Sequence, residues 1–326
     1  MNRKINIIFE KFGKNHVDAA VRLALRELEN ERKLCADLPY EDFSGHLSGM
    51  LNWLSDQPFG RAAMVDGRLV GYMSFAGPFN GFFGDVKGVF SPLGGSAFSY
   101  DYENRGRLAS MLFEDIAADF VKQSVFSCSL SRYAHDEEIA KSLVLNGFGI
   151  RCSDAVRDIS RLSLSHSFGD ARFIELSTSE FNRIRELRLR LVKHLEKSPV
   201  FYPTDMRRFE EWFKKQDMRV FAVEVDEKII GFISIEDEGE SFISEAHSMK
   251  NICGAYFDEN YRGIGLAQSL LAYVIDTLRL EGVTNLGVDC ETLNPTALNF
   301  WGKYFEMYTY SFARRIDERV SLNRKE

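Results

Sequence analysis

The stretch that decides the fold runs from residue 251 to residue 267 and reads NICGAYFDENYRGIGLA. Its first seven residues have the composition of a short, mostly buried strand. Beyond Gly265, apolar residues recur at spacings of three and four, which predicts a helix over 266–281 with Gly282 at its C-terminal end. A strand, a glycine-containing turn and a helix gather unpaired backbone amides at the helix N-terminus. The partial positive charge there favours a phosphate or pyrophosphate.

Three kinds of phosphate-binding loop compete for this turn. A P-loop requires Gly-Lys followed by Ser or Thr, and no Gly-Lys pair in the sequence has that continuation. A dinucleotide-binding fingerprint requires Gly-x-Gly-x-x-Gly. Gly263 and Gly265 meet its first two positions, but Gln268 stands at the third. The third pattern is Arg/Gln-x-x-Gly-x-Gly/Ala, which Arg262, Gly265 and Ala267 match at every position.

In this third pattern the sequence resembles the GNAT superfamily, whose members transfer an acyl group from acyl-CoA to an amine. The resemblance implies that the loop binds the pyrophosphate of acetyl-CoA, with Arg262 as a fixed cation. The backbone amides implied are those of Gly263, Ile264, Gly265, Leu266 and Ala267. It also implies that the preceding strand splays from its neighbour. The backbone of Ala255, Tyr256 and Phe257 would then hold the pantetheine arm and polarise the thioester carbonyl.

A second motif follows at the start of the last predicted helix. Asn294 is a good N-cap and Pro295 a good first helical residue. The stretch is similar to the family pattern Asn-x-x-Ala-x-x-aromatic-Tyr, which lies beside the CoA arm, so Asn294 and Trp301 are expected at the cofactor. Trp301 stands where the family has a Tyr that often protonates the CoA thiolate. Because indole has no proton of useful pKa, Tyr304 or solvent is left for that role, and core packing is the alternative interpretation of these aromatic residues.

The 326 residues predict two domains, and the chain divides into two similar halves. Each half offers an amphipathic helix, two strands around a tight turn, a long helix, an apolar strand and a closing helix. We expect an α/β chain of two tandem GNAT-like domains, each a mixed, mostly antiparallel sheet flanked by helices. Residues 1–162 would form a degenerate domain and residues 163–326 the acetyltransferase domain, joined in the Ser-rich segment 160–170.

The first half keeps the outline of the predicted fold but loses the loop. Its corresponding stretch is taken as residues 104–110, in which Arg105 matches Arg262. Leu108 and Ser110 stand where the pattern has glycine and glycine or alanine. We therefore expect this half to have lost acetyl-CoA binding.

Composition excludes several classes of function. The formal net charge of −7 argues against a broad nucleic-acid interface, and no apolar run approaches the roughly 20 residues of a membrane span. The five cysteines are scattered without a Cys-x-x-Cys pair, so neither a disulfide framework nor a metal site is predicted. These features fit a cytoplasmic monomer or homodimer.

The chemistry implied by the family is direct attack of a neutral primary amine, of a small molecule or peptide, on the thioester of acetyl-CoA. A base must take the proton of the amine. The candidates are Glu236, Glu245, His247, Asp289 and Glu291, with Glu245 and His247 ranked first because they precede the strand that polarises the carbonyl. The alternative is a non-catalytic acyl-CoA-binding or regulatory module.

Overall fold

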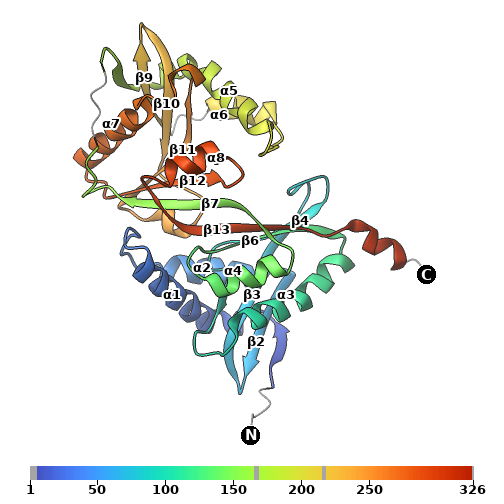
Figure 1. Cartoon of the computed structure of the whole chain (residues 1–326). Helices are drawn as coiled ribbons and strands as arrows, with labels where there is room; N and C mark the ends of the chain where they lie inside the picture. Colours follow the sequence, from blue (N-terminus) through green and yellow to red (C-terminus); the bar gives the residue numbers. More distant parts are fainter. Residues whose placement is uncertain (1–5, 165–168, 215–217, 325–326) are drawn as a thin grey trace. The chain divides into compact units, whose positions relative to one another are not determined.

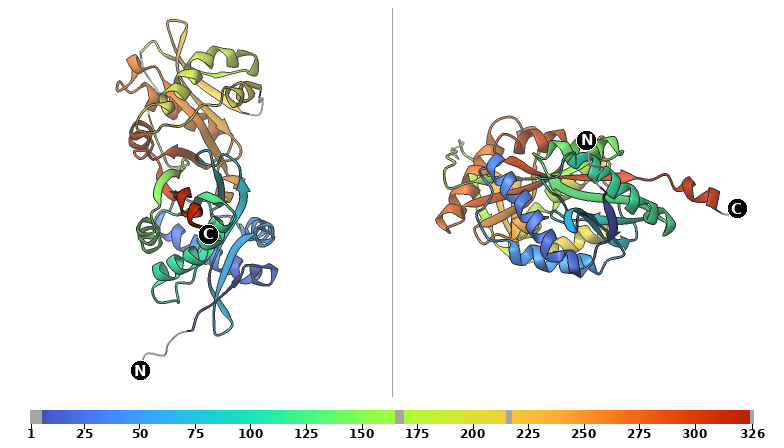
Figure 2. Two further views of the ribbon diagram at one scale, coloured as in Figure 1. Left: turned by 90° about the vertical axis from the view of Figure 1, so that its right-hand side faces the viewer. Right: turned by 90° about the horizontal axis from the view of Figure 1, so that it is seen from below.

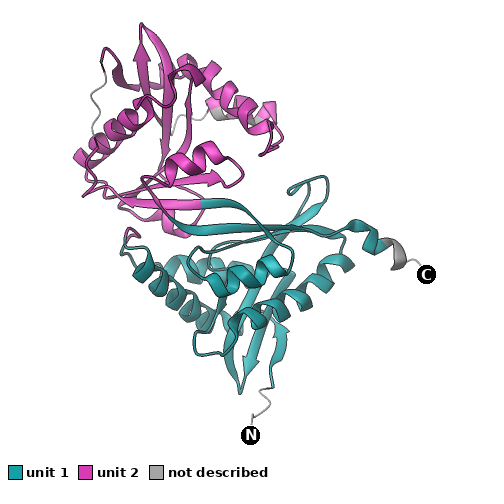
Figure 3. Ribbon diagram, in the orientation of Figure 1, with its two compact units in different colours: residues 1–36, 40–153, 307–326 teal, residues 37–39, 154–306 magenta. Residues whose placement is uncertain are grey.

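A computed structural model describes residues 6–164, 169–214 and 218–324, and its chain forms two compact units (Figures 1 and 3). Unit 1 contains Met1–Ala36, Tyr40–Ser153 and Met307–Glu326, and unit 2 contains Asp37–Pro39 and Asp154–Glu306. Part of the expected join, residues 165–168, lies outside the described residues. No described helix is long and apolar enough to cross a membrane.

Unit 1 is a mixed, mostly antiparallel sheet flanked by helices (Figures 1 and 2). Its sheet order is β1-β2-β3-β4-β6-β13, with β5 also paired to β3. Only β4 and β6 run parallel among the pairs recorded for these strands. The elements are β1 (Ile8–Lys11), α1 (Val17–Leu34), α2 (Ser44–Ser55), β2 (Phe59–Val65), β3 (Arg68–Phe79), β4 (Lys87–Ser91), β5 (Ser96–Phe98), α3 (Arg105–Lys122), β6 (Val125–Tyr133), α4 (Glu137–Leu145), β7 (Gly149–Asp158) and β13 (Glu306–Arg315).

Unit 2 repeats this plan. Its sheet order is β8-β9-β10-β11-β12-β7, and β11 and β12 are its parallel pair. The elements are β8 (Arg172–Leu176), α5 (Arg185–Glu196), α6 (Met206–Lys214), β9 (Arg219–Val225), β10 (Lys228–Glu236), β11 (Met249–Phe257), α7 (Leu266–Leu280), β12 (Asn285–Glu291) and α8 (Pro295–Trp301). The same succession of strands and helices in both units confirms the fold class and its tandem arrangement.

The two faces of the unit 2 sheet carry different helices. On one face, Ile184 and Leu187, from the start of α5 and the turn before it, pack on Val220, Phe232 and Tyr256 of β9, β10 and β11. We call this the α5 face. On the opposite face, Tyr273 of α7 contacts Phe221 of β9 edge-on. Because side chains alternate along a strand, Phe221 and Val220 lie on opposite faces.

Each unit takes its last strand from the other half of the sequence. Strand β13, at the C-terminal end of the chain, pairs antiparallel with β6, from Thr309↔Tyr133 to Arg315↔Ser127. Conversely, β7 follows the helices of the first half but continues past Asp154 into unit 2, where it lies next to β12. The two units therefore differ from the halves 1–162 and 163–326. Hydrophobic patterning cannot reveal this, because either sheet satisfies the backbone bonds of an apolar strand.

The exchange is structurally required in unit 1, because every residue of β6 is buried and needs a neighbour on both sides. Phe312 of β13 is fully buried in the core cluster of unit 1, among residues of α3, α4 and β6.

Phe312→Ala is expected to lower the free energy of unfolding by about 3–5 kcal/mol through the cavity it leaves. Urea unfolding measures the loss, and hydrogen exchange should assign it to amides of unit 1, although Phe312 lies near the C-terminus. Val320→Ala, at an exposed residue of the same terminal segment, is the matched control. Loss of protection confined to unit 2 would contradict the exchange.

Candidate active site

Strands β11 and β12 part halfway along their length. Their parallel pairing runs from Met249↔Asn285 to Ile252↔Val288 and stops there. At the same point the register between β10 and β11 shifts, since Ser234 pairs with Gly254 but Ile235 pairs with Ile252, which leaves Cys253 as a β-bulge. From Cys253 onward, β11 keeps β10 on one side and has no recorded pairing with β12 on the other.

The open edge of β11 presents backbone groups at alternate residues. The amide of Asp258 donates to the carbonyl of Ile230 on β10, at 2.8 Å. Because amides alternate in direction along a strand, those of Ala255 and Phe257 point away from β10. Tyr256 instead bonds toward β10, and its side chain is buried on the α5 face. Of the three strand residues expected at the cofactor, Ala255 and Phe257 therefore offer their amides to the open edge.

The loop after β11 leaves a row of amides free. Gly263 and Gly265 have φ of 78° and 96°, and Gly265 is the N-cap of α7. The first backbone bond of the helix joins the amide of Ser269 to the carbonyl of Gly265, at 3.0 Å. Among the described residues, nothing accepts a hydrogen bond from the amides of residues 263–268. Residues 263–265 are exposed, and a Cβ at residue 263 would meet no atom within 4 Å, so an anion has room to approach.

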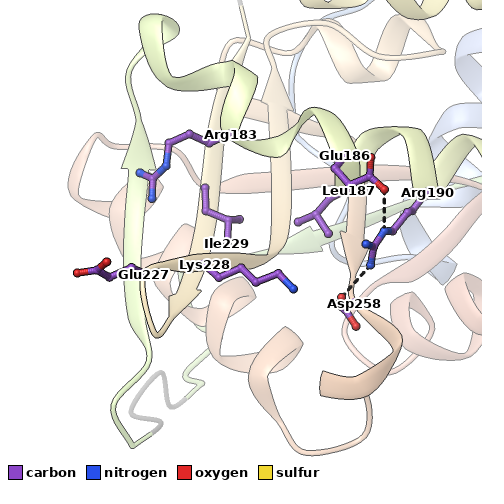
Figure 4. Close-up of a pocket in the computed structure, with 8 residues that line it drawn as sticks. All are labelled: Arg183, Glu186, Leu187, Arg190, Glu227, Lys228, Ile229 and Asp258. Carbon is purple, nitrogen blue, oxygen red and sulfur yellow. Dashed lines mark hydrogen bonds and ion pairs between the residues drawn. The ribbon is translucent and has the colours of Figure 1, made fainter.

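The entrance to this loop is held by ion pairs. Asp258 accepts a hydrogen bond from the amide of Asn260, which lowers the pKa of its carboxyl group. Arg190 of α5 binds the same carboxylate at 2.9 Å and also reaches Glu186 at 3.2 Å (Figure 4). Arg262 donates through Nε to the carbonyl of Phe257 at 3.0 Å and stacks over Tyr256 at 5.1 Å. The guanidinium of Arg262 is thereby fixed where strand and loop join.

Beside these ion pairs lies a cavity of about 310 Å³, drawn in Figure 4. It lies between the start of α5 and the turn from β9 to β10. The charged groups of its lining are three cations and three carboxylates, so it has no excess charge to bind an anion. The lining residues are Arg183, Glu186, Leu187, Arg190, Glu227, Lys228, Ile229 and Asp258.

The second motif mainly builds α8. The Oδ1 atom of Asn294 accepts from the amide of Ala297 at 3.3 Å, so the predicted N-cap is confirmed and only the amide nitrogen of this side chain is left for a ligand. Trp301 is buried and packs edge-on against Phe300 and Phe305. This environment matches the core-packing interpretation of Trp301.

Tyr304 lies just after α8. It donates its hydroxyl to Oε1 of Gln268, in the first turn of α7, at 3.1 Å. Burial raises the pKa of Tyr304, which keeps the phenol protonated.

Asp289 lies at the point where the strands part. It follows Val288, the last residue of β12 paired to β11. Residue 287 faces the side chains of Met249 and Asn251, so Asp289, two residues on, lies on the same face of the sheet. Asn251 pairs with Glu236, which shares the α5 face with Phe232.

The environment of Asp289 favours its protonated form. The side chain is accessible to solvent, but surrounding protein atoms displace much of its water. This desolvation, together with the negative charges of Glu240, Asp154 and Glu291, raises the pKa of Asp289 to about 7.

The two residues ranked first as bases lie before the start of β11. Glu245 ends a short 3₁₀ helix, Phe242–Glu245, and His247 follows it; both are exposed and precede the first residue of β11. At roughly 3.3 Å per residue, about 13 Å of strand separates Met249 from Cys253, where the strands part. The position of Asp289 therefore suits proton transfer at the parting strands better than theirs.

In unit 1 the corresponding loop differs from the expected alignment. Asn104 has φ of 66° and is the N-cap of α3, as Gly265 is of α7. Counted from the N-caps, Asp101 corresponds to Arg262, and Arg105 is already the first residue of the helix. The alignment of Arg105 with Arg262 was wrong by four residues, because the arginine match outweighed the N-cap signal of asparagine.

The N-terminus of α3 already holds an internal anion. The amide of Gly106 donates to Oε1 of Glu138 at 2.8 Å, and the amide of Arg107 donates to Asn104 at 3.2 Å. Leu108, which was aligned with the glycine of the pattern, is buried in the core of unit 1. In unit 1 the carboxylate of Glu138 thus occupies the helix N-terminus that is open in unit 2, and Asp101 adds a second negative charge nearby in the loop.

A buried ion network lies beside this loop. Arg105 binds Asp136 with both terminal nitrogens, at 3.1 and 2.6 Å, and Arg132 bridges Asp136 and Glu27 at 3.0 and 2.8 Å. All four side chains are more than nine-tenths buried. A cavity of about 380 Å³, lined in part by Tyr100, Arg105 and Asp136, remains outside the network.

Comparison with known proteins agrees with this architecture. Residues 184–307 match the model of the acetyltransferase (GNAT) family. No curated protein gives a significant match to the sequence. The fold is similar to that of a GCN5-related N-acetyltransferase from Sphaerobacter thermophilus, with a TM-score of 0.61 and 12% identity over 95% of each chain.

A second solved structure has the same fold. It contains a GCN5-related glucosamine N-acetyltransferase region within a fungal multi-domain GH3 β-N-acetylglucosaminidase. The TM-score is 0.54 at 12% identity, over 96% of this chain and 38% of that one. The family match identifies residues 184–307 as a GNAT acetyltransferase domain, and the chain has the fold of these solved GNAT structures. It carries two GNAT folds in tandem, and the family match falls in the second.

The raised pKa of Asp289 has a measurable effect on stability. An unfolded Asp ionises near pH 4, whereas folded Asp289 holds its proton to about pH 7. Between these values the unfolded state has lost the proton that the folded state retains, so Asp289 lowers the free energy of unfolding as pH rises. Asp289→Asn should therefore gain stability over the wild type from pH 4.5 to pH 8, as measured by urea unfolding.

The control for loss of a carboxylate is Asp85→Asn, at an exposed turn. If both variants keep a constant difference from the wild type across this range, the shifted ionisation of Asp289 is disproved.

Proposed function

We propose that the protein is an N-acetyltransferase that uses acetyl-CoA bound by unit 2. The observation that carries this proposal is the contrast between the two helix N-termini. The amides before α7 are open and exposed, whereas those before α3 are bonded to Glu138 and Asn104. Among the described residues of unit 2, these amides and the guanidinium of Arg262 together match the charge and shape of a diphosphate.

The parted strands suit the rest of the donor. An extended pantetheine arm can lie along the open edge of β11 and bond to the backbone of Ala255 and Phe257. An amide on this edge can also bond to the thioester oxygen, where negative charge develops during attack. The family supplies the chemistry, and this chain supplies the backbone donors.

Acyl transfer needs a base for the attacking amine. We assign this role to Asp289, whose pKa of about 7 is close to the operating pH. The nitrogen of a neutral amine forms a bond to the acyl carbon, the carbon–sulfur bond breaks, and the proton of the amine passes to Asp289. The CoA thiolate leaves and takes a proton from solvent or from Tyr304, whose phenol is protonated at neutral pH.

The charge around Asp289 indicates the class of acceptor. Asp154, Glu240 and Glu291 all act on Asp289 as negative charges. Such a field attracts a protonated amine, and a base within it can accept the proton that the amine must lose. The acceptor proposed is accordingly a primary amine of a small molecule or peptide.

The loop assignment is tested with a matched pair of glycine variants. Gly263 (φ 78°) and Gly67 (φ 73°) share the left-handed conformation, and a Cβ at either residue would meet no atom within 4 Å. Each substitution by alanine should destabilise the chain by a similar ~1–2 kcal/mol. Only Gly263→Ala should weaken acetyl-CoA binding, by about 10-fold, in calorimetry.

The calorimetric titration also gives the number of acetyl-CoA sites per chain. Wild-type protein should bind one acetyl-CoA per chain, since unit 1 has filled its own helix N-terminus. No binding, or equal effects of the two glycine variants, would refute the assignment of the loop.

Catalysis is tested by release of the CoA thiol with a library of amines. The wild-type rate should rise with pH through about pH 7 as Asp289 ionises, and Asp289→Asn should lower it by about 10²- to 10⁴-fold. Glu245→Gln and His247→Asn test the two other candidate bases. If one of these lowers the rate to that degree and Asp289→Asn does not, the assignment of the base is wrong. Binding of acetyl-CoA without turnover of any amine would favour a non-catalytic module.

A further inference from the structure

A half-buried arginine lies against the strand that would carry the thioester. Arg188 extends from α5 toward Gly254, the residue after the bulge of β11. A Cβ at residue 254 would lie 2.5 Å from Nη1 of Arg188 and 3.0 Å from Oγ of Ser234. Glycine at this position therefore makes room for the guanidinium, which rests directly on the backbone at the parting strands.

Protein atoms surround much of the guanidinium of Arg188, and Glu236 and Cys253 are among its electrostatic neighbours. Burial lowers the pKa of Arg188, because it removes water from the charged form, and Glu236 and Cys253 offset this only in part. The thiol of Cys253 donates to Ser234 at 3.3 Å, and burial raises its pKa to about 12, so it is uncharged. A guanidinium in such a setting interacts strongly with a carboxylate, because the local dielectric is low.

Arg188 and Asp289 flank the parted strands on one face. Arg188 comes from α5 and lies over Gly254, two residues beyond the last pair of β11 with β12. Asp289 is one residue beyond that pair on β12 and faces the same side. A cation from α5 and a carboxylate from β12 therefore face the proposed reaction centre.

We propose that Arg188 binds a carboxylate of one of the two reactants beside the transferred acyl group. This inference rests on the proposed acyl transfer and narrows its substrates. The carboxylate belongs either to the acceptor, which is then an amino acid or a similar zwitterion with its amine toward Asp289, or to a dicarboxylic acyl group such as that of succinyl-CoA. Planar, two-point bonding to a carboxylate is the interaction that guanidinium makes best.

The test pairs each acceptor with its decarboxylated form: glycine with methylamine, L-ornithine with putrescine, and L-lysine with cadaverine. Each is assayed by thiol release with acetyl-CoA and with succinyl-CoA. For an acceptor carboxylate, wild-type protein should prefer the amino acids, and Arg188→Gln should raise their KM by about 10- to 100-fold while leaving the decarboxylated amines unchanged. For an acyl carboxylate, the preference for succinyl-CoA over acetyl-CoA should fall by the same factor. Arg188→Lys should recover part of either loss.

Arg185→Gln is the matched control, because Arg185 is on the same helix but pairs with Glu210 at the surface. Binding of CoA, measured by calorimetry, should be the same in all variants, which shows that α5 and the loop are intact. Equal discrimination in wild type and Arg188→Gln would overturn the inference and leave the acyl transfer standing.

If wild-type protein turns over no amine, the proposed function fails and the carboxylate site is judged by binding alone. Glycine, L-ornithine, L-lysine and succinate are then titrated into the CoA complex. Loss of binding in Arg188→Gln supports the site, and no binding to wild type excludes it.

Discussion

The site depends on backbone amides that the fold itself leaves unpaired. A helix cannot satisfy its first amides internally, and a strand that has lost its neighbour cannot satisfy its outer edge. In unit 2 both deficits occur together, because β11 separates from β12 after Ile252 and then leads into the glycine loop before α7. A ligand with a diphosphate and an extended amide-containing arm satisfies both.

Unit 1 shows how the same fold closes this site. Glu138 accepts a hydrogen bond from an amide in the first turn of α3. Asp101 occupies the position that corresponds to Arg262 in unit 2. The ion network of Glu27, Arg105, Arg132 and Asp136 fills the space beside the loop with paired charges. Breaking a pair of this kind would leave a buried charge, so the network ties α1, α3 and β6 together. Within one chain, unit 1 thus pairs internally the helix N-terminus that unit 2 leaves open.

The exchange of β7 and β13 joins the folding of the two halves. Neither half of the sequence contains all the strands of one sheet, and β6 is buried along its whole length only because β13 covers its free edge. In unit 1 the pairing of β6 with β13 joins the first half of the chain to its last strand. The unit that carries the proposed chemistry likewise needs the last strand of the first half.

Local sequence determined most of the elements and the loop of this protein. Periodic apolar residues predicted the helices, and Arg262, Gly265 and Ala267 predicted a glycine turn before α7, because these signals are carried by residues close together in the chain. The tertiary structure decided what depends on distant residues. It set the strand exchange, and it placed Glu138 against the first turn of α3, where it bonds an amide that would otherwise be open to a ligand. It also brought Arg188 and Asp289 together beside the bulge at Cys253. From the sequence alone, Glu245 and His247 were ranked above Asp289 as candidate bases because they precede the strand. The point where the strands part and the charges around Asp289 become visible only when the sheet is assembled.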